Sequence, residues 1–359
     1  MMNSFNPPVK FRLGELFCGP GGIGCGASNT SVQHNGVTYS VGHSWANDYD
    51  PFACATYRHN NHIDADSVVC EDVSEFSKRA ESLPDIDILT FGFPCNDFSQ
   101  VGERLGIDGK FGPLYTYGIH FLRVKRPAVF VAENVSGLKN SGDTFAKILK
   151  EMRDLGYEVT AHLYHFEDYG VPQNRHRIVI VGINSDLMPG TKFMVPAPTH
   201  SDNPVTCQQA IDVPPITALM SNIELTKQSR SVIERLKYIK PGQNCWSAEL
   251  PQELQLNVTG ARISQIYRRL DPTKPSYTVT GSGGGGTHVY HWSENRALTN
   301  RERARLQSFP DTYVFQGPKE AVRKQIGMAV PPLAAQIILE AALKTVLKIS
   351  YDSVTPNLK

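Results

Sequence analysis

The segment 16–26 has the sequence LFCGPGGIGCG and carries the strongest indication of architecture in this chain. It follows an apolar run, 12–18, that is typical of a strand, and a segment with helical character comes next. Its five glycines allow positive φ angles and a close approach of the backbone to a ligand, although a merely tight turn would also use them. The pattern predicts a strand that ends in a ligand-binding turn at the start of a helix.

Alternating strand-like and helix-like segments continue from this turn through the first half of the chain. Such alternation with short connections predicts a mostly parallel sheet that is covered by helices on both faces, which is a doubly wound α/β fold. The expected strands are 12–18, 38–45, 67–69, 86–91, 128–132, 158–164 and 177–183, and the expected helices are 51–59, 115–124, 145–155, 299–306 and 332–348. Ligands bind outside the carboxyl ends of strands in such sheets, so polar residues at those ends are site candidates.

Composition excludes several classes of protein. The 359 residues are 40% hydrophobic, and no uninterrupted apolar run approaches the roughly 18 residues that span a membrane. The N-terminus has no signal-peptide pattern, so we expect a cytoplasmic protein. The seven cysteines form no CxxC pair, which argues against a structural zinc site and against a disulfide framework.

The character of the sequence changes after about residue 183. A segment rich in Pro, Thr and Ser leads into a stretch with few periodic runs, which predicts a second, smaller, irregular domain of mostly β structure. We expect a catalytic and cofactor-binding domain at 1–187, a target-recognition domain and hinge at 188–318, and a return to the first domain at 319–359. Residues 224–275 contain nine basic and five acidic side chains, a balance that suits a phosphate backbone and equally a solvated surface.

Three residues beyond the glycine-rich turn suggest a nucleoside pocket. Asp48 follows the second long strand and is placed to accept hydrogen bonds from ribose hydroxyls. Tyr49 offers a ring for an adenine, and Asp72 is placed to receive the adenine amino group. Each alone is as well explained as a capping aspartate or a surface tyrosine, and only their order along the chain suggests a pocket.

The segment 92–99, GFPCNDFS, directly follows the strand 86–91. Pro94 fixes the backbone before Cys95 at a strand end, where a thiolate would face the predicted pocket. A buried structural cysteine is the alternative. Four glycines in 96–112 suggest a loop that closes over a substrate, where Ser99 and Arg104 are candidates for touching it.

Two further motifs carry charged groups beside strands. Glu133 ends the strand 128–132, where a carboxyl group can hold or donate a proton to a ring nitrogen. Arg175 precedes the strand 177–183 and Arg177 begins it, and both are suited to grip a base carbonyl or a phosphate. The glycine-rich stretch around Thr280, Gly281, Ser282, Gly283 and Gly284 is a candidate major-groove loop, with a flexible linker as the alternative. Apolar residues with strand-like alternation flank it, at positions 277, 279, 289, 290 and 292.

These blocks, in this order, resemble the DNA (cytosine-5) methyltransferases of prokaryotic restriction-modification systems. The likeness covers nearly the whole chain and extends through 298–311, LTNRERARLQSFPD, and 327–332, GMAVPP. One departure is Met328, where family members usually have Asn. The signature of amino-methyltransferases, Asp or Asn before Pro-Pro-Tyr or Pro-Pro-Phe, is absent.

The resemblance implies a Rossmann-like S-adenosyl-methionine-dependent methyltransferase domain that acts on a cytosine flipped out of double-stranded DNA. It implies that Cys95 attacks carbon 6, that Glu133 engages N3 and the exocyclic amine, and that Arg177, with Arg175 nearby, contacts O2. The cofactor pocket it implies is made by Phe17, Cys18, Gly19, Gly21, Gly22, Ile23, Asp48, Tyr49, Asp72, Val73, Pro94, Leu114, Ala329 and Val330. No metal is expected.

Two alternatives remain open at this level. One is an RNA methyltransferase of the same fold that modifies tRNA, and the other is a catalytically idle relative that binds DNA. A monomer is expected, with a restriction endonuclease as a possible partner encoded nearby.

Overall fold

The structure is a computed structural model that describes residues 7–61, 63–93, 114–141, 143–257, 264–281 and 285–358. The chain divides into two compact units. The first contains 1–165, 176–198 and 330–359, and the second contains 166–175 and 199–329. The functional domain boundaries 1–187, 188–318 and 319–359 remain a prediction.

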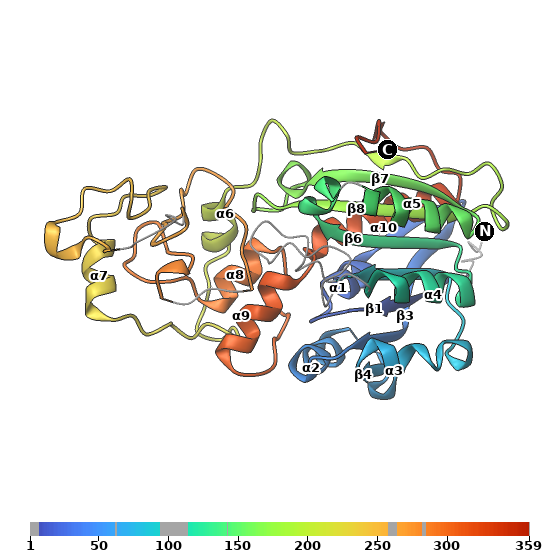
Figure 1. Cartoon of the computed structure of the whole chain (residues 1–359), viewed down its shortest axis with the longest axis horizontal. Coiled ribbons are helices and arrows are strands. Elements are labelled where there is room, and N and C mark those ends of the chain that lie inside the picture. Colours follow the sequence, from blue (N-terminus) through green and yellow to red (C-terminus); the bar gives the residue numbers. More distant parts are fainter. Residues whose placement is uncertain are drawn as a thin grey trace, which may run out of the picture. The chain divides into compact units, whose positions relative to one another are not determined.

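The first unit is built around one mixed sheet with the strand order β2-β3-β1-β5-β6-β8-β7, in which β4 also pairs with β3 (Figure 1). The strands are β1 (Val9–Leu16), β2 (Ser31–His34), β3 (Val37–Asp48), β4 (Val68–Cys70), β5 (Ile88–Gly92), β6 (Val129–Val135), β7 (Tyr157–His165) and β8 (His176–Asn184). The central strands β4, β3, β1, β5 and β6 run parallel, whereas β8 is antiparallel to both β6 and β7. The predicted α/β fold is therefore confirmed, with a more mixed sheet than expected.

Helices cover the sheet in two groups. The helices are α1 (Gly22–Asn29), α2 (Pro51–Asn60), α3 (Val73–Ser77), α4 (Tyr115–Lys125), α5 (Asp143–Asp154) and α10 (Pro332–Val346). Helix α1 packs against α10, while α3, α4 and α5 contact one another in turn (Figure 1). A Cβ on Gly26 would lie 2.5 Å from the carbonyl oxygen of Pro332, so glycine allows α1 and α10 to approach this closely.

Aromatic side chains fill the core between the sheet and α3 to α5. Trp45, Phe76 and Phe121 are buried together, and the rings of Phe76 and Phe121 stack with centroids 5.7 Å apart. Each fully buried ring stabilises the fold by about 2–3 kcal/mol through the hydrophobic effect.

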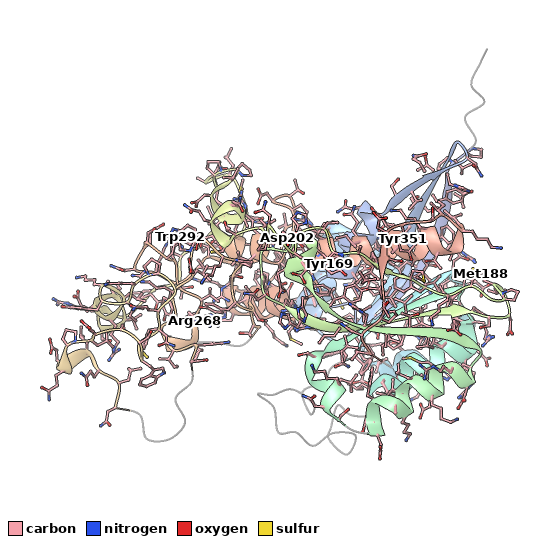
Figure 2. The ribbon with its side chains drawn as sticks, turned by 90° about the horizontal axis from the view of Figure 1, so that it is seen from above. Tyr169, Met188, Asp202, Arg268, Trp292 and Tyr351 are labelled. Atoms are coloured by element: carbon pink, nitrogen blue, oxygen red, sulfur yellow. The ribbon has the colours of Figure 1, made fainter. Side chains whose placement is uncertain are left out.

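The C-terminal segment covers the edge strand β7. The side chain of Asn357 accepts a hydrogen bond from the Leu163 amide at 2.7 Å and donates to its carbonyl at 3.1 Å. Tyr351, labelled in Figure 2, donates its hydroxyl to the Met194 carbonyl at 2.7 Å, beside the short antiparallel pair β9 (Val195–Pro196) and β10 (Ser353–Val354). Satisfying these backbone groups protects an edge that would otherwise pair with another chain.

The stretch 319–346 has the length and composition of a helix that could cross a membrane, but 67% of its most apolar window is buried within the protein. It consists of two helices, α9 (Lys319–Met328) and α10, separated by Ala329–Pro331. A buried core helix passes the same test as a membrane span, so the apolar character of α10 is explained by its packing.

The second unit is smaller than the first and irregular. Its α-helices are α6 (Cys207–Asp212), α7 (Arg230–Leu236), α8 (Asn300–Leu306) and α9. The expected mostly β structure is not found in the described part of this unit, where strand pairing is limited to isolated bridges such as Arg269 with Tyr290. The alternating apolar residues near 277–292 that suggested strands are buried by loop packing instead, and Val279 and Tyr290 are both fully covered.

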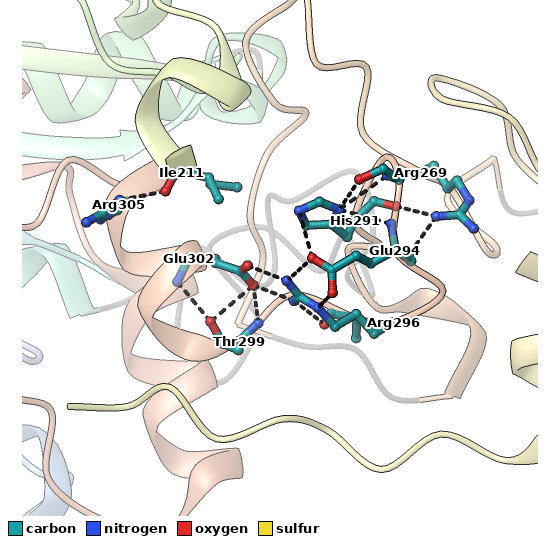
Figure 3. A network of polar contacts seen from close by, with 10 residues as sticks. Ile211, Arg269, His291, Glu294, Arg296, Thr299, Glu302 and Arg305 are labelled. Carbon is teal, nitrogen blue, oxygen red and sulfur yellow. Dashed lines mark hydrogen bonds and ion pairs between the residues drawn. The ribbon is translucent and has the colours of Figure 1, made fainter. Parts of the chain in front are cut away.

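Polar contacts replace sheet hydrogen bonds in this unit (Figure 3). Arg296 forms ion pairs with Glu294 at 2.8 Å and with Glu302 at 2.7 Å. Glu302 also accepts from the Thr299 amide, and the two residues form a capping box at the start of α8. Arg305 donates to the Ile211 carbonyl at 2.6 Å, which ties α8 to α6. Irregular loops are thus held by charge networks whose arginines are largely buried.

Candidate active site

The glycine-rich turn connects β1 to α1 and adopts left-handed backbone angles. Phe17, Gly19 and Gly21 have φ of 53°, 53° and 90°. The Cys18 amide donates to the Asn47 carbonyl at 3.0 Å, which fixes the turn against the end of β3. A Cβ at Gly19 would meet no atom of the described residues within 4 Å, so the backbone faces open space in this part of the structure. The predicted strand, turn and helix are confirmed, and Gly22 and Ile23 form the buried first turn of α1.

Asp48, at the end of β3, binds the turn itself. Its Oδ2 accepts from the Gly19 amide at 2.8 Å, and its Oδ1 accepts from the Asp50 amide at 2.9 Å. Burial raises the pKa of Asp48 above its usual value, and the bonds to these amides oppose that rise. The carboxylate therefore shapes the glycine turn, a role that its position in the sequence did not reveal.

Tyr49 and Asp72 follow the carboxyl ends of β3 and β4, which pair in parallel with Asp48 opposite Cys70. Tyr49 is 62% exposed, so most of its side chain lies at the surface. Asp72 caps α3 by accepting from the Ser74 amide at 2.8 Å, and its hydrogen bonds to Ser74 lower its pKa. Asn47 donates to the carbonyls of Val69 and Glu71, both at 3.0 Å, and so joins the two strand ends.

The other predicted cofactor residues are placed individually. Val73 is buried in the first turn of α3, and Leu114, which precedes α4, is partly buried against the main core. Ala329 belongs to the second unit and Val330 to the first. Pro94 lies outside the described residues.

Glu133 and Arg177 form an ion pair at the ends of two adjacent strands. Arg177 Nε lies 2.9 Å from Glu133 Oε1, and each side chain is 15% exposed. Arg177 pairs in register with Val135, and Glu133 pairs with Gly92 at the end of β5. Burial lowers the pKa of Arg177, while the neighbouring Glu133 carboxylate opposes that shift. The sequence predicted both residues, and the structure brings them together.

Because residue 92 is a glycine, the Glu133 carboxylate can lie against the backbone of the neighbouring strand β5. A Cβ there would lie 3.4 Å from Glu133 Oε2, so the carboxylate rests against the backbone where β5 ends. Asn134 is buried and donates from its side chain to the Phe93 carbonyl at 3.3 Å. We did not assign Asn134 a role from the sequence, although its place after Glu133 was a usable signal. Cys95, Ser99 and Arg104 follow Phe93 and lie outside the described residues.

Arg175 occupies a different environment from Arg177. Its guanidinium donates to the carbonyls of Val279, Gly327 and Ala329 at 3.2, 3.1 and 3.0 Å, all within the second unit. The side chain is 2% exposed. These backbone carbonyls satisfy N–H donors of a buried guanidinium, as burial requires. The contact to a base or phosphate that the sequence suggests for Arg175 stays a prediction.

The start of the glycine-rich loop, Thr280–Gly281, packs on helix α9. A Cβ at Gly327 would lie 2.0 Å from the Gly281 nitrogen, so these backbones are in direct contact. Met328, where the family pattern has Asn, is 58% exposed. The predicted contacts Ser282, Gly283 and Gly284 lie outside the described residues.

Comparison with known proteins agrees with this arrangement. Residues 11–344 match the family model for C-5 cytosine-specific DNA methylases. The chain belongs to this family. It is 54% identical over 356 residues to the Type II methyltransferase M.BbvI of Brevibacillus brevis, covering 96% of this chain and 94% of the relative. It is 40% identical to M.NgoFVII of Neisseria gonorrhoeae over 353 residues, covering 96% and 88%.

Solved structures share the fold at lower identity. A prophage-encoded protein of Escherichia coli is 21% identical and superposes with a TM-score of 0.70, covering 94% of this chain and 99% of its own. The Dnmt2 methyltransferase of S. pombe is 16% identical with a TM-score of 0.58, covering 94% and 100%. The methylase is a DNA (cytosine-5-)-methyltransferase, and its family implies S-adenosyl-methionine as the methyl donor.

Proposed function

We propose that this methylase modifies a cytosine within a specific sequence of double-stranded DNA, and that Cys95 is the nucleophile. The Glu133–Arg177 pair carries the proposal, since its partners lie 2.9 Å apart beside the end of β5. Cys95 follows two residues after Phe93, whose carbonyl Asn134 holds. A thiolate at this position would be close to a carboxylate and a guanidinium suited to one pyrimidine ring.

The chemistry follows from the weak nucleophilicity of cytosine carbon 5. The Cys95 thiolate adds to carbon 6, and the electron pair displaced from the C5–C6 bond makes carbon 5 nucleophilic. Glu133 engages N3 and the exocyclic amine, while Arg177 donates to O2, so both stabilise the charge that develops on the ring. After alkylation, loss of the C5 proton re-forms the double bond and expels Cys95.

The residues of the first unit fit S-adenosyl-methionine. Gly19 faces open space, Tyr49 presents an exposed ring, and Asp72 lies at the surface with its carboxylate charged. These residues, with Phe17 and Val73, would hold the adenosyl part, and Asp48 would shape the turn and accept from the ribose. The cofactor supplies a methyl group activated by a sulfonium.

Further aspects of the function rest on the named relatives. The Type II relatives support a role in a restriction-modification system, with an endonuclease encoded nearby and a cytoplasmic, nucleoid-associated location. We expect a monomer that needs no metal. The target cytosine must leave the helix, because carbon 6 cannot be reached inside a base-paired stack.

A covalent trap tests the nucleophile. Duplex DNA carrying 5-fluorocytosine at the methylated position retains the enzyme, because fluorine blocks the elimination step. We expect a denaturation-resistant adduct with the wild type and cofactor, and none with Cys95→Ser. Cys70→Ser, which alters an exposed thiol, is the matched control and retains the adduct. An adduct with Cys95→Ser would refute the assignment, and preferential methylation of tRNA over duplex DNA would refute the substrate.

A further inference from the structure

Arg268 is one of several arginines of the second unit whose charge no carboxylate in the described part of the chain compensates, and its guanidinium stacks on an aromatic ring. It lies between two buried residues, Tyr267 at 8% and Arg269 at 3% exposure. Arg268 itself is half-buried, and Figure 2 marks its place in this unit. No carboxylate of the described residues pairs with it, whereas Arg296 and Arg305 both form ion pairs.

The two neighbours fix the backbone that carries Arg268. The Arg269 guanidinium donates to the carbonyls of His291 and Glu294, each at 2.6 Å (Figure 3). It also donates to the Leu236 carbonyl at 2.6 Å. Tyr267 adopts a φ of 50°, a left-handed angle that costs a non-glycine residue about 1 kcal/mol or more. Its buried ring packs against that of Tyr290, with centroids 5.8 Å apart, which maintains this conformation.

Tyr277 orients the Arg268 side chain. The guanidinium carbon lies 4.7 Å from the centroid of the Tyr277 ring. The Tyr277 hydroxyl donates to the carbonyl of Arg268 at 2.9 Å, so ring and backbone hold each other. A stacked guanidinium keeps its plane fixed and leaves its in-plane N–H donors available to a planar acceptor.

We propose that Arg268 recognises a guanine of the target sequence through the major groove and that Tyr277 is its positioning residue. Guanine presents O6 and N7 as adjacent acceptors in that groove, and arginine matches them with two parallel hydrogen bonds. Preorganisation by Tyr267, Arg269 and Tyr277 lowers the entropy lost on binding. This assignment rests on the proposed sequence-specific action on duplex DNA and adds a residue outside the predicted loop 280–284.

A phosphate is the other acceptor that this guanidinium would fit, and the two predict different results. A base contact changes methylation at one position of the target sequence only. A phosphate contact weakens binding to all sequences alike and lowers the slope of log K against log salt by about one.

The test uses the full-length enzyme with cofactor on a duplex library randomised around the methylated cytosine, scored by bisulfite sequencing. We expect Arg268→Met and Arg268→Lys to lower kcat/KM by roughly 10- to 100-fold for sites with guanine at one position, and to accept other bases there. Tyr277→Leu should relax the same position more weakly. The control Arg230→Met, an exposed arginine of the same unit, should leave the profile unchanged.

Three outcomes would overturn the assignment to a guanine. A uniform loss across all sequences with a smaller salt slope would indicate a phosphate contact. An unchanged profile, with melting temperatures equal to the wild type, would exclude Arg268 from the DNA contact. If Arg268→Met and Arg268→Lys both fail to fold, the role of Arg268 is structural. Failure of the wild type to methylate any duplex would instead refute the proposed function.

Discussion

The ion pair between Glu133 and Arg177 allows a direct test of whether the active site is already formed before DNA binds. The perturbation is a double-mutant cycle of Glu133→Gln, Arg177→Met and the double variant. The charged atoms lie 2.9 Å apart, with each side chain 15% exposed, which is intermediate between a surface pair and a fully buried one. Exposed pairs couple by about 0.2–1 kcal/mol, and removing one partner of a buried pair costs about 3–5 kcal/mol.

We therefore expect each single variant to lose about 2 kcal/mol of unfolding free energy and the pair to couple by about 1–2 kcal/mol. Urea unfolding followed by tryptophan fluorescence measures these values. The pair Glu234–Lys237 is the matched control, since its atoms lie 2.8 Å apart but its side chains are 38% and 51% exposed. Its coupling should stay below about 0.5 kcal/mol.

The cycle also separates stability from catalysis. Glu133→Gln should lower kcat by roughly 100-fold or more, because the amide cannot exchange a proton with N3 as the carboxyl group does. A coupling energy for Glu133 and Arg177 no larger than that of the exposed control would refute the reasoning, since the pair would then not be formed in the free enzyme.

Three other predictions concern packing, pH and the cofactor. Gly327→Ala should destabilise the protein by about 3 kcal/mol and lower its melting temperature, because the new Cβ would lie 2.0 Å from the Gly281 nitrogen. Helix propensity alone predicts that alanine stabilises α9, so a more stable variant would contradict the observed packing. Burial raises the pKa of Glu15 from 4.5 to about 8, so the folded state holds a proton that the unfolded state releases and stability falls as pH rises between these values. Glu15→Gln should remove this loss, and a constant difference in melting temperature from pH 5 to pH 8 would refute it. Tyr49→Ala should raise the KM for the cofactor roughly tenfold, because the variant loses a ring that stacks on the adenine. The free energy of unfolding should change by less than about 0.5 kcal/mol, because the side chain is 62% exposed. An unchanged KM would exclude stacking by Tyr49.

The α/β core was predictable because its signals are local. Buried strands such as β5 and β6 are short apolar runs, and the amphipathic pattern of α5 has the period of a helix, so neighbours in the sequence suffice to identify them. The antiparallel direction of β8 was not predictable in this way. Strand direction depends on where the connecting chain returns, and residues 166–175 pack into the second unit before β8 begins.

The second unit shows where local patterns mislead. Its alternating apolar residues suggested strands, yet Val279 and Tyr290 are buried by loops that hydrogen bonds from Arg175 and Arg269 hold in place. Arg175 and Val279, for example, are 104 positions apart in the sequence. Periodicity contains no information about such partners.

The sequence by itself determined the order of the chemical groups: a glycine-rich turn, the block that contains Cys95, then Glu133 and Arg177, each at the end or start of a strand. Only the tertiary structure decided which charges meet. It paired Glu133 with Arg177, engaged Arg175 with backbone carbonyls, and left Arg268 stacked on Tyr277 without an acidic partner in the described chain. Residue type fixes what a side chain can bind, but the partner that it finds depends on distances and desolvation, which arise when distant segments pack together.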